Sequence, residues 1–142
     1  MQRSIPFLAV LLLAATLLTQ ACKSSEALPS TQVRLGKTQS ARLGSGVTVR
    51  VDSILDSRCP QGVQCIIAGY ASAALRVSTD ADTRSLTLFL GYRLANNPAM
   101  TDSTVVSLGG QRYSVLLRDI TPYPVYGKPT ADKQALVEVK AL

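Results

Sequence analysis

The 142-residue sequence contains no histidine and no tryptophan. The lack of histidine excludes Ser-His-Asp and Cys-His catalysis, His-based zinc sites and the most common general base at neutral pH. No G-x-S-x-G segment is present, so a hydrolase-type serine nucleophile is not indicated either. A Ser–Lys dyad is left open, because it has no such sequence signature. The composition therefore favours a protein that is not an enzyme and that carries no cofactor.

Clusters of metal ligands and of basic residues are also lacking. Asp80 and Asp82 share one turn, but the Asp-x-Asp-x-Asp-Gly spacing and the later bidentate Glu of a calcium loop are absent, which favours a solvated turn and no metal. The 15 basic residues exceed the 9 acidic ones, giving a net charge of +6. They are scattered singly along the chain, so we expect no nucleic-acid partner.

The first 21 residues have the composition of a secretory signal peptide. Arg3 precedes an apolar run from Ile5 to Leu18, and the small residue Ala21 follows. The run is shorter than the about 20 apolar residues that a transmembrane helix needs. We therefore predict an exported protein, with a retained membrane anchor as the alternative. Loss of Arg3 with the signal peptide would lower the net charge of +6 by one.

The segment from Leu18 to Cys22, LTQAC, resembles the lipobox of bacterial lipoproteins, although Thr19 stands where that signal usually has leucine. The resemblance implies cleavage before Cys22, acylation of its thiol and of the new amino group, and anchoring to a membrane by acyl chains. Lys23 follows the cysteine, which by the Gram-negative sorting rules implies the outer membrane, facing the periplasm. An ordinary secreted protein is the alternative.

The mature chain is predicted to be a tether followed by one β domain. Residues 22–32 contain the lipidated cysteine and a Ser/Thr/Pro-rich flexible segment, and residues 33–142 form the domain. Turn signals recur every 8 to 14 residues, including Gly109-Gly110, and separate runs rich in Val, Leu, Thr and Tyr. This pattern predicts an all-β antiparallel sandwich, or a barrel-like sandwich, of about seven to eight short strands. One of them is a weaker strand within 33–43.

Alternation within these runs indicates which side chains face the core. The clearest example runs from Val47 to Leu55, where every second residue up to Val51 is apolar. A longer loop is expected from Tyr92 to Asp102. Other side chains predicted to share an apolar face are Leu75 and Val77; Leu86, Leu88 and Leu90; Tyr113, Val115 and Leu117; and Val137, Val139 and Ala141, opposite Leu136, Glu138 and Lys140.

The densest local signal is DSRCPQGVQCIIAG, from Asp56 to Gly69, which contains Cys59 and Cys65. Exported proteins meet an oxidising compartment, where paired cysteines become disulfides. The intervening PQGVQ suits a turning loop, so we predict a structural Cys59–Cys65 disulfide. A redox dithiol, a metal site and two free thiols are the alternatives. The first lacks C-x-x-C spacing, and the second would need two more ligands.

The flanks of the two cysteines predict the local structure. Asp56 is expected to bond the backbone amides that follow it, and Arg58 either pairs with Asp56 or lies free. Ile66 and Ile67 are expected to re-enter the core. Gly69 predicts a bulge or a close approach of two backbone segments.

The segment DSRCPQGVQCIIAGYA, from Asp56 to Ala71, resembles a motif of a family of small uncharacterised bacterial lipoproteins and secreted proteins. The later LLRDITPYP, from Leu116 to Pro124, resembles an apolar segment of the same family. The family often has tryptophan where this chain has Ile67. The resemblance implies export and a small β domain, and it carries over no activity and no functional residues.

The best candidate binding surface is the proline-rich segment around Tyr123 and Tyr126, because tyrosine offers contact area at low entropic cost. The alternative is that both rings cap one end of the sandwich. If this segment and the cysteine loop lie at the same end, Gln61 and Gln64 would belong to the same surface.

The sequence thus predicts a lipid-anchored envelope protein that acts as a non-enzymatic binding or structural accessory module. The alternative is an inhibitor or modulator of an envelope enzyme, which would present the stapled loop from Gln61 to Gln64. The expected partners are the membrane, through the lipid anchor, and an envelope protein. No oligomeric state is indicated.

Overall fold

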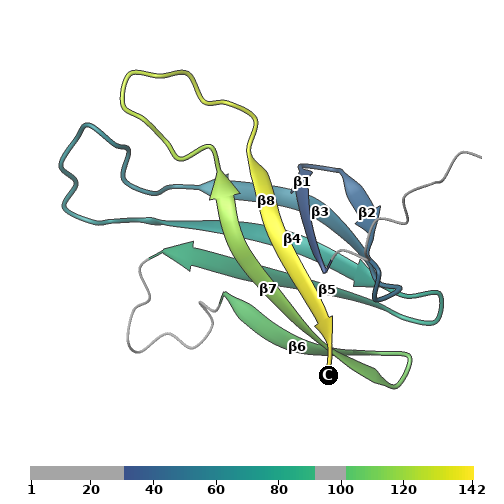
Figure 1. Ribbon diagram of the computed structural model, residues 1–142. Coiled ribbons are helices and arrows are strands. Elements are labelled where there is room, and N and C mark those ends of the chain that lie inside the picture. Colours follow the sequence, from purple (N-terminus) through teal and green to yellow (C-terminus); the bar gives the residue numbers. More distant parts are fainter. Residues whose placement is uncertain (1–30, 92–101) are drawn as a thin grey trace, which may run out of the picture.

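Eight antiparallel strands in two four-stranded sheets make up the computed structural model, which describes residues 31–91 and 102–142 (Figure 1). The predicted signal peptide, Cys22, nearly all of the predicted tether and residues 92–101 of the predicted longer loop lie outside the described residues. The sandwich predicted from the sequence is confirmed. No helix in the part of the chain described is long and apolar enough to cross a membrane.

The first sheet has the order β1-β8-β7-β6, and the second has the order β2-β3-β4-β5. The strands are β1 (Gln32–Gly36), β2 (Ser40–Arg42), β3 (Thr48–Asp56), β4 (Tyr70–Ser78), β5 (Thr83–Gly91), β6 (Ser103–Leu108), β7 (Gln111–Thr121) and β8 (Gln134–Ala141). The segment at 33–43, expected to be one weak strand, forms the two short strands β1 and β2. They lie in different sheets because the chain turns between them, where Gln39 N–H donates to the Gly36 carbonyl at 3.1 Å.

The core lies between the inner faces of the two sheets, as the alternation predicted. Val49 and Val51 of β3 are buried, whereas Arg50 between them is exposed. The β6–β7 hairpin turns at Gly109 and Gly110, whose φ angles of 57° and 86° suit a tight turn that residues with a side chain rarely adopt. The buried apolar residues are Leu35, Leu43, Val47, Val49, Val51, Ala71, Ala73, Leu75, Val77, Leu88, Leu108, Tyr113, Val115, Leu117, Ile120, Ala135, Val137 and Val139.

Two β-bulges change which side chains face inward near one end of the sandwich. The register shifts between Val51 and Ser53 in β3, and again between Leu117 and Asp119 in β7. Each bulge adds one residue, Asp52 or Arg118, and so reverses the inward and outward positions beyond it.

This reversal determines which side chains are buried and which are exposed at the ends of β3 and β7. In β7 it buries Ile120 completely. In β3 it turns Leu55 outward, where the side chain is 65% exposed. The same reversal brings the carboxylate of Asp56 inside, with only 3% of its side chain exposed.

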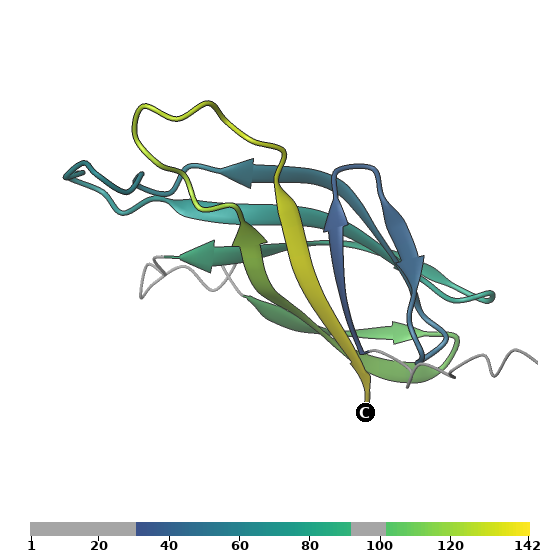
Figure 2. The same ribbon diagram turned by 45° about the horizontal axis from the view of Figure 1, so that its top comes forward.

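The two longest described loops, 57–69 between β3 and β4 and 122–133 between β7 and β8, project from the same end of the sandwich (Figures 1 and 2). The chain enters β1 at the other end. Gln32 pairs with Glu138 late in β8, and Val139 N–H donates to the Thr31 carbonyl at 2.8 Å. We call the end formed by the two loops the stapled end.

Candidate functional site

The loop at 57–69 is closed by a disulfide between Cys59 and Cys65, with an S–S distance of 2.10 Å and a Cα–Cα distance of 5.9 Å. This confirms the structural staple predicted from the sequence. Both sulfurs are engaged with each other, so the alternatives of a metal site and of free thiols do not describe this structure. Among residues 31–91 and 102–142, no three His, Cys, Asp or Glu side chains are grouped so that they could hold a metal ion.

The two arms of this loop leave the sheet side by side. Ser57 N–H donates to the Tyr70 carbonyl at 2.9 Å, and Cys59 N–H donates to the Ala68 carbonyl at 2.7 Å. Gly69 has a φ of +70°, and a Cβ atom built on it would lie 2.0 Å from the Ser57 carbonyl oxygen. Of the bulge and the close approach of two backbones that Gly69 left open, the close approach is the one observed, and no residue with a side chain fits there.

The stapled loop is hydrogen-bonded to the loop at 122–133. Gln61 N–H donates to the Pro124 carbonyl at 3.0 Å, and the Gln61 carbonyl accepts from Tyr126 N–H at 2.9 Å. Gln61 and Val125 thus form a short parallel bridge. Two segments that are more than 50 residues apart in the chain are thus joined at one end of the sandwich. The condition under which Gln61 and Gln64 would share a surface with the tyrosines is met. Gln64 is exposed in the same loop.

A nearly buried group of charges lies at the base of the stapled end. The Arg58 guanidinium donates two hydrogen bonds to the Asp56 carboxylate, Nε to Oδ1 at 2.8 Å and Nη2 to Oδ2 at 2.7 Å. The Lys133 ammonium lies 3.0 Å from the same Oδ2. The exposed fractions of the side chains are 3% for Asp56, 10% for Arg58 and 14% for Lys133. Of the two possibilities left open for Arg58, pairing with Asp56 is the one observed, and Lys133 is a partner that the sequence did not reveal.

Burial and pairing act in opposite directions on the pKa of Asp56. Burial raises it, but hydrogen bonds from Arg58 and Lys133 and from the Arg58 amide outweigh burial, so the pKa lies below its ordinary value. The hydrogen bond to Asp56 raises the pKa of Arg58. Asp56 therefore stays ionised in the folded protein at any pH well above its ordinary pKa.

Arg58 also connects this charge group to the second loop. Its Nη2 donates to the Ile120 carbonyl at 2.7 Å, at the end of β7. Its guanidinium carbon lies over the Tyr123 ring, 4.3 Å from the ring centroid, which is a cation–π contact. Lys133 donates in addition to the Pro122 carbonyl. The two loops are thus fixed both to each other and to the sheets beneath them.

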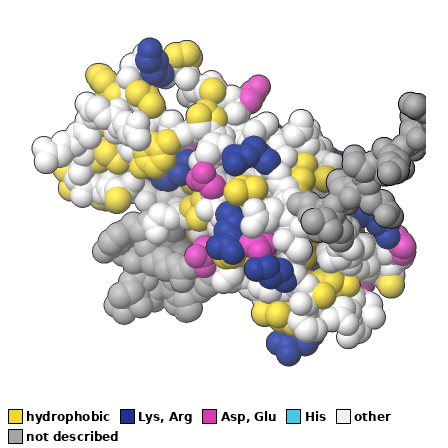
Figure 3. Space-filling model, in the orientation of Figure 1, with side chains coloured by type: hydrophobic (Ala, Val, Ile, Leu, Met, Phe, Trp, Pro, Cys, Tyr) yellow, Lys and Arg dark blue, Asp and Glu magenta, His cyan; other side chains and the backbone are white. Residues whose placement is uncertain are grey.

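The stapled end exposes most of the large apolar side chains found on the described surface (Figure 3). The expectation that Ile66 and Ile67 re-enter the core is wrong, since Ile66 is fully exposed and Ile67 is 74% exposed. They sit in the projecting part of the loop, beyond the reach of the core between the sheets. Ten large apolar side chains are exposed among residues 31–91 and 102–142, and eight of them belong to this end: Leu55, Val63, Ile66, Ile67, Tyr70, Tyr123, Val125 and Tyr126.

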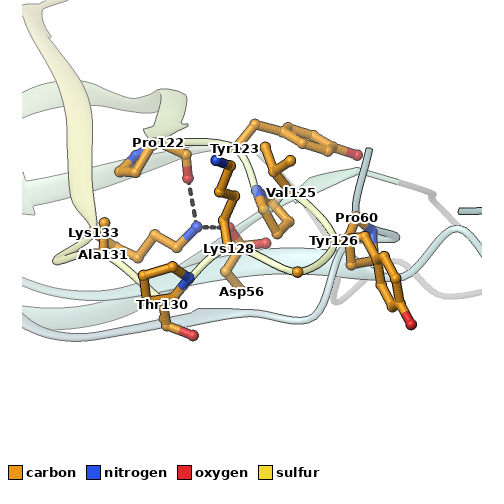
Figure 4. A pocket seen from close by; sticks show the side chains of 13 residues that line it. Asp56, Pro60, Pro122, Tyr123, Val125, Tyr126, Lys128, Thr130, Ala131 and Lys133 are labelled. Atoms are coloured by element: carbon orange, nitrogen blue, oxygen red, sulfur yellow. Dashed lines mark hydrogen bonds and ion pairs between the residues drawn. The ribbon is translucent and has the colours of Figure 1, made fainter. Parts of the chain in front are cut away.

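An open cleft of about 450 Å³ runs beside the second loop (Figure 4). Its walls are mainly proline, tyrosine and valine, and its charged lining residues are Asp56, Lys128 and Lys133. Figure 4 shows the Lys133 ammonium between the Pro122 carbonyl and Asp56. Tyr123 and Tyr126 both line the cleft and remain partly exposed, Tyr126 at 70%. Both rings therefore keep accessible surface at this end of the sandwich.

The remaining charged side chains singled out from the sequence lie elsewhere. Asp80 and Asp82 pair with Arg42 and Arg84 at distances of 3.3 and 3.2 Å. Glu138 is buried on β8, and hydrogen bonds from Lys140 and then Arg118 lower its pKa despite burial. None of these groups lines the cleft.

Two features of the site do not follow from the sequence analysis above. They are the contact of Lys133 with Asp56, and the inversion by which Leu55 faces solvent and Asp56 faces inward. Lys133 lies in a turn-rich segment without periodicity, so nothing in the sequence points to its position. The inversion did leave a signal. In each bulged strand two adjacent polar residues, Asp52-Ser53 or Arg118-Asp119, interrupt an alternating pattern and are followed by apolar residues.

Family models, curated proteins and solved structures were all compared with the chain, and none of them matches it.

Proposed function

We propose that the chain is a lipid-anchored protein of the bacterial envelope, held through Cys22, and that it binds a partner protein through the stapled end. The single observation that carries the second part is the clustering of exposed apolar side chains on two loops that are locked together. Scattered apolar residues are normal on a protein surface, whereas a contiguous cluster marks an interaction site.

The rigidity of the stapled end supports a binding role. Exposed loops usually lose conformational freedom when they bind, and that loss weakens affinity. Here the disulfide, the Gln61–Val125 bridge and the bonds of Arg58 already fix the loops. Tyr123 and Tyr126 add broad contact area with few rotatable bonds. The stapled end is therefore preorganised for a partner.

The chemistry of the cleft favours binding over catalysis. Its one lining carboxylate, Asp56, is neutralised by Arg58 and Lys133 and has a lowered pKa, which makes it a poor proton acceptor. The walls offer hydrophobic contact with a few charged groups that can orient a ligand, as in a binding cleft.

The second candidate, an inhibitor of an envelope enzyme, rests on the exposure of Gly62, Val63 and Gln64 within the disulfide ring. Inhibitory loops often pair their backbone with a strand of the enzyme. In this loop both the N–H and the carbonyl of Gln61 are already bonded to the second loop. Only the segment after Gln61 can be presented, so the stapled end fits a broad docking surface better than an extended inhibitory loop.

The docking proposal is tested in cells by photo-crosslinking. A photoreactive amino acid replaces Tyr126 or Ile67 in one set of strains, and Val105 in another. Val105 is a matched control, because it is also an exposed apolar residue but lies on β6, outside the stapled end. We expect a discrete protein adduct from positions 126 and 67 and none from 105. Equal labelling at all three positions, or no protein adduct from either loop, would refute the proposal.

The anchor is tested separately by mass spectrometry of the mature protein. We expect the chain to begin at Cys22 and to carry acyl groups, and we expect Cys22→Ser to abolish them and to release the protein from membranes. An unmodified Cys22, or a mature chain with a different first residue, would rule out the anchor while leaving the docking surface untouched.

A further inference from the structure

We infer that the cleft beside the 122–133 loop receives the acidic side chain of an extended segment of the partner protein. This inference rests on the proposed docking function and specifies its chemistry. The apolar neighbours of that acidic residue would lie on the exposed tyrosine and isoleucine side chains of the stapled end. Three observations carry it: an unused donor, an excess of positive charge and the location of the surface.

The unused donor belongs to Lys133. A lysine ammonium has three N–H groups. Two are engaged, one with the Pro122 carbonyl and one with Asp56. The third N–H has no partner among the described residues. Because Lys133 lines the cleft with 14% of its side chain exposed, an incoming oxygen can reach it without displacing the two existing partners.

The charges around the cleft favour an anion. Its lining contains the two ammonium groups of Lys128 and Lys133 and the single carboxylate of Asp56, which Arg58 also neutralises. Asp119 acts on Arg58 from outside the cleft, and its carboxylate accepts from the Ile120 amide at 2.8 Å. A carboxylate entering beside Lys133 therefore meets net positive charge, and the partly dehydrated site strengthens the contact.

The walls suit the rest of an extended peptide. Pro60, Pro124 and Pro129 form stiff apolar surface, and Tyr126 offers an exposed ring at the rim. Ile66 and Ile67 are exposed on the stapled loop, which is bonded to the 122–133 loop through Gln61 and has no charged residue from Cys59 to Gly69. Apolar residues of the partner segment therefore have matching surface on the prolines and Tyr126 of the cleft and on the stapled loop.

The position of the stapled end favours a partner protein over the membrane that holds the anchor. The chain enters the domain at the opposite end, beside Val139. Residues 22–31 span at most about 35 Å when fully extended. The nine residues of β3 alone extend about 30 Å, and the stapled loop projects beyond them. For the stapled end to point at the anchoring membrane, the tether would have to stretch along the whole domain, which favours arrangements in which that end faces away from the membrane.

The inference is tested by selecting binders from a random library of peptides of about twelve residues, displayed on phage, against the full mature chain in detergent micelles. We expect selected peptides to be enriched in Asp or Glu next to apolar residues. Replacing the acidic residue by its amide should weaken binding at least about tenfold. Selected peptides without acidic enrichment, or a selection that yields no binder, would overturn the inference.

Variants locate the bound carboxylate. Lys133→Gln should remove the preference for the acidic peptide over its amide twin, and so should Lys128→Gln in part. Lys128 is exposed and makes no charged pair with another described residue, so its replacement does not threaten folding. Lys37→Gln is the matched control, because Lys37 is exposed in the turn between β1 and β2. An unchanged preference in both cleft variants would place the carboxylate elsewhere.

A fluorescence experiment tests the alternative that the stapled end binds the membrane instead of a protein. The chain has no tryptophan, so Ile67→Trp introduces a single reporter at an exposed position. We expect the emission of the lipidated variant in anionic phospholipid vesicles to stay that of a solvent-exposed indole, and to shift to the blue when a selected acidic peptide is added. A blue shift on vesicles alone would overturn the inference. If crosslinking captures a protein but the peptides show no acidic preference, docking stands and only the carboxylate chemistry fails.

Discussion

The guanidinium of Arg58 lies over the ring of Tyr123, 4.3 Å from its centroid, and at the same time forms two hydrogen bonds with Asp56. One side chain of the stapled loop thus contacts the end of β3 through Asp56, the Pro-Tyr-Pro segment through Tyr123 and the end of β7 through Ile120. The exposed surface that we propose for docking is supported from beneath by this residue. Its removal should loosen both loops at once.

Arg58→Ala should therefore lower the free energy of unfolding by about 3 kcal/mol, since it leaves the buried carboxylate of Asp56 with one partner fewer. Arg58→Lys should also destabilise the protein, because an ammonium cannot form the two-pronged pair. The control is Arg42→Ala, which breaks the exposed pair with Asp80 and should cost less than about 1 kcal/mol. Urea unfolding measures all three, and equal losses for Arg58→Ala and Arg42→Ala would contradict the role of burial.

The lowered pKa of Asp56 predicts a pH-dependent contribution to stability. The ionised carboxylate stabilises the fold at pH values above its unfolded pKa of about 4, and this contribution is lost as the pH falls through the lower pKa of the folded state. Asp56→Asn should accordingly be less stable than the parent protein at neutral pH, with the difference shrinking below about pH 4.

The pKa of Glu138 is also lowered, so the pH dependence of the parent protein's stability contains contributions from both Asp56 and Glu138. The comparison should be made with Glu138→Gln as the common background, by urea unfolding from neutral to acidic pH. A stability difference that stays constant down to about pH 2 would show that ionisation of Asp56 is not responsible.

The disulfide should stabilise the stapled end without being needed for the sandwich. A ring of this size contributes about 2 kcal/mol in the chain-entropy estimate. Cys59→Ala together with Cys65→Ala should lower stability by that amount and leave the far-UV circular dichroism of the folded protein unchanged, because no core residue lies between the two cysteines. In the parent protein both thiols should resist labelling until a reductant is added, and labelling without reductant would contradict the staple.

Gly69→Ala should lower the free energy of unfolding by more than the positive φ at this position alone would cause. Its Cβ would lie 2.0 Å from the Ser57 carbonyl oxygen, so the two arms of the loop would have to separate. Gly46→Ala is the matched control: φ is +79° at Gly46, yet nothing lies within 4 Å of the added atom. We expect a loss of about 1 kcal/mol at Gly46 and at least twice that at Gly69. Similar unfolding midpoints for the two variants would argue against the close approach.

Much of the fold could be predicted from the sequence because sheets that bury one face impose a period of two. Val49 and Val51, Leu75 and Val77, and Tyr113, Val115 and Leu117 alternate clearly, and all are buried. The staple could be predicted from two cysteines around a turn-forming segment. Both predictions rest on local patterns, which a single chain reveals.

The arrangement of the site could not be predicted in the same way, because it depends on contacts between distant segments. Nothing in the sequence indicates that Gln61 pairs with Val125, or that Lys133 reaches Asp56. The apolar character of Ile66 and Ile67 predicts a position in the core, but both are exposed in the projecting loop next to the disulfide ring. Whether these apolar residues are exposed depends on how the loops fold, whereas hydrophobicity alone predicts that they are buried.

The bulges at Asp52 and Arg118 each absorb one extra residue in a strand, and this sets the character of the stapled end. If β3 kept Asp52 in a regular ladder without a bulge, Leu55 would turn toward the core and Asp56 toward solvent, away from Arg58 and Lys133. Deletion of Asp52 would instead close the bulge and leave the residues beyond it facing as they do now. An insertion that adds one residue to β3 without a second bulge is therefore the change to which this surface is least tolerant.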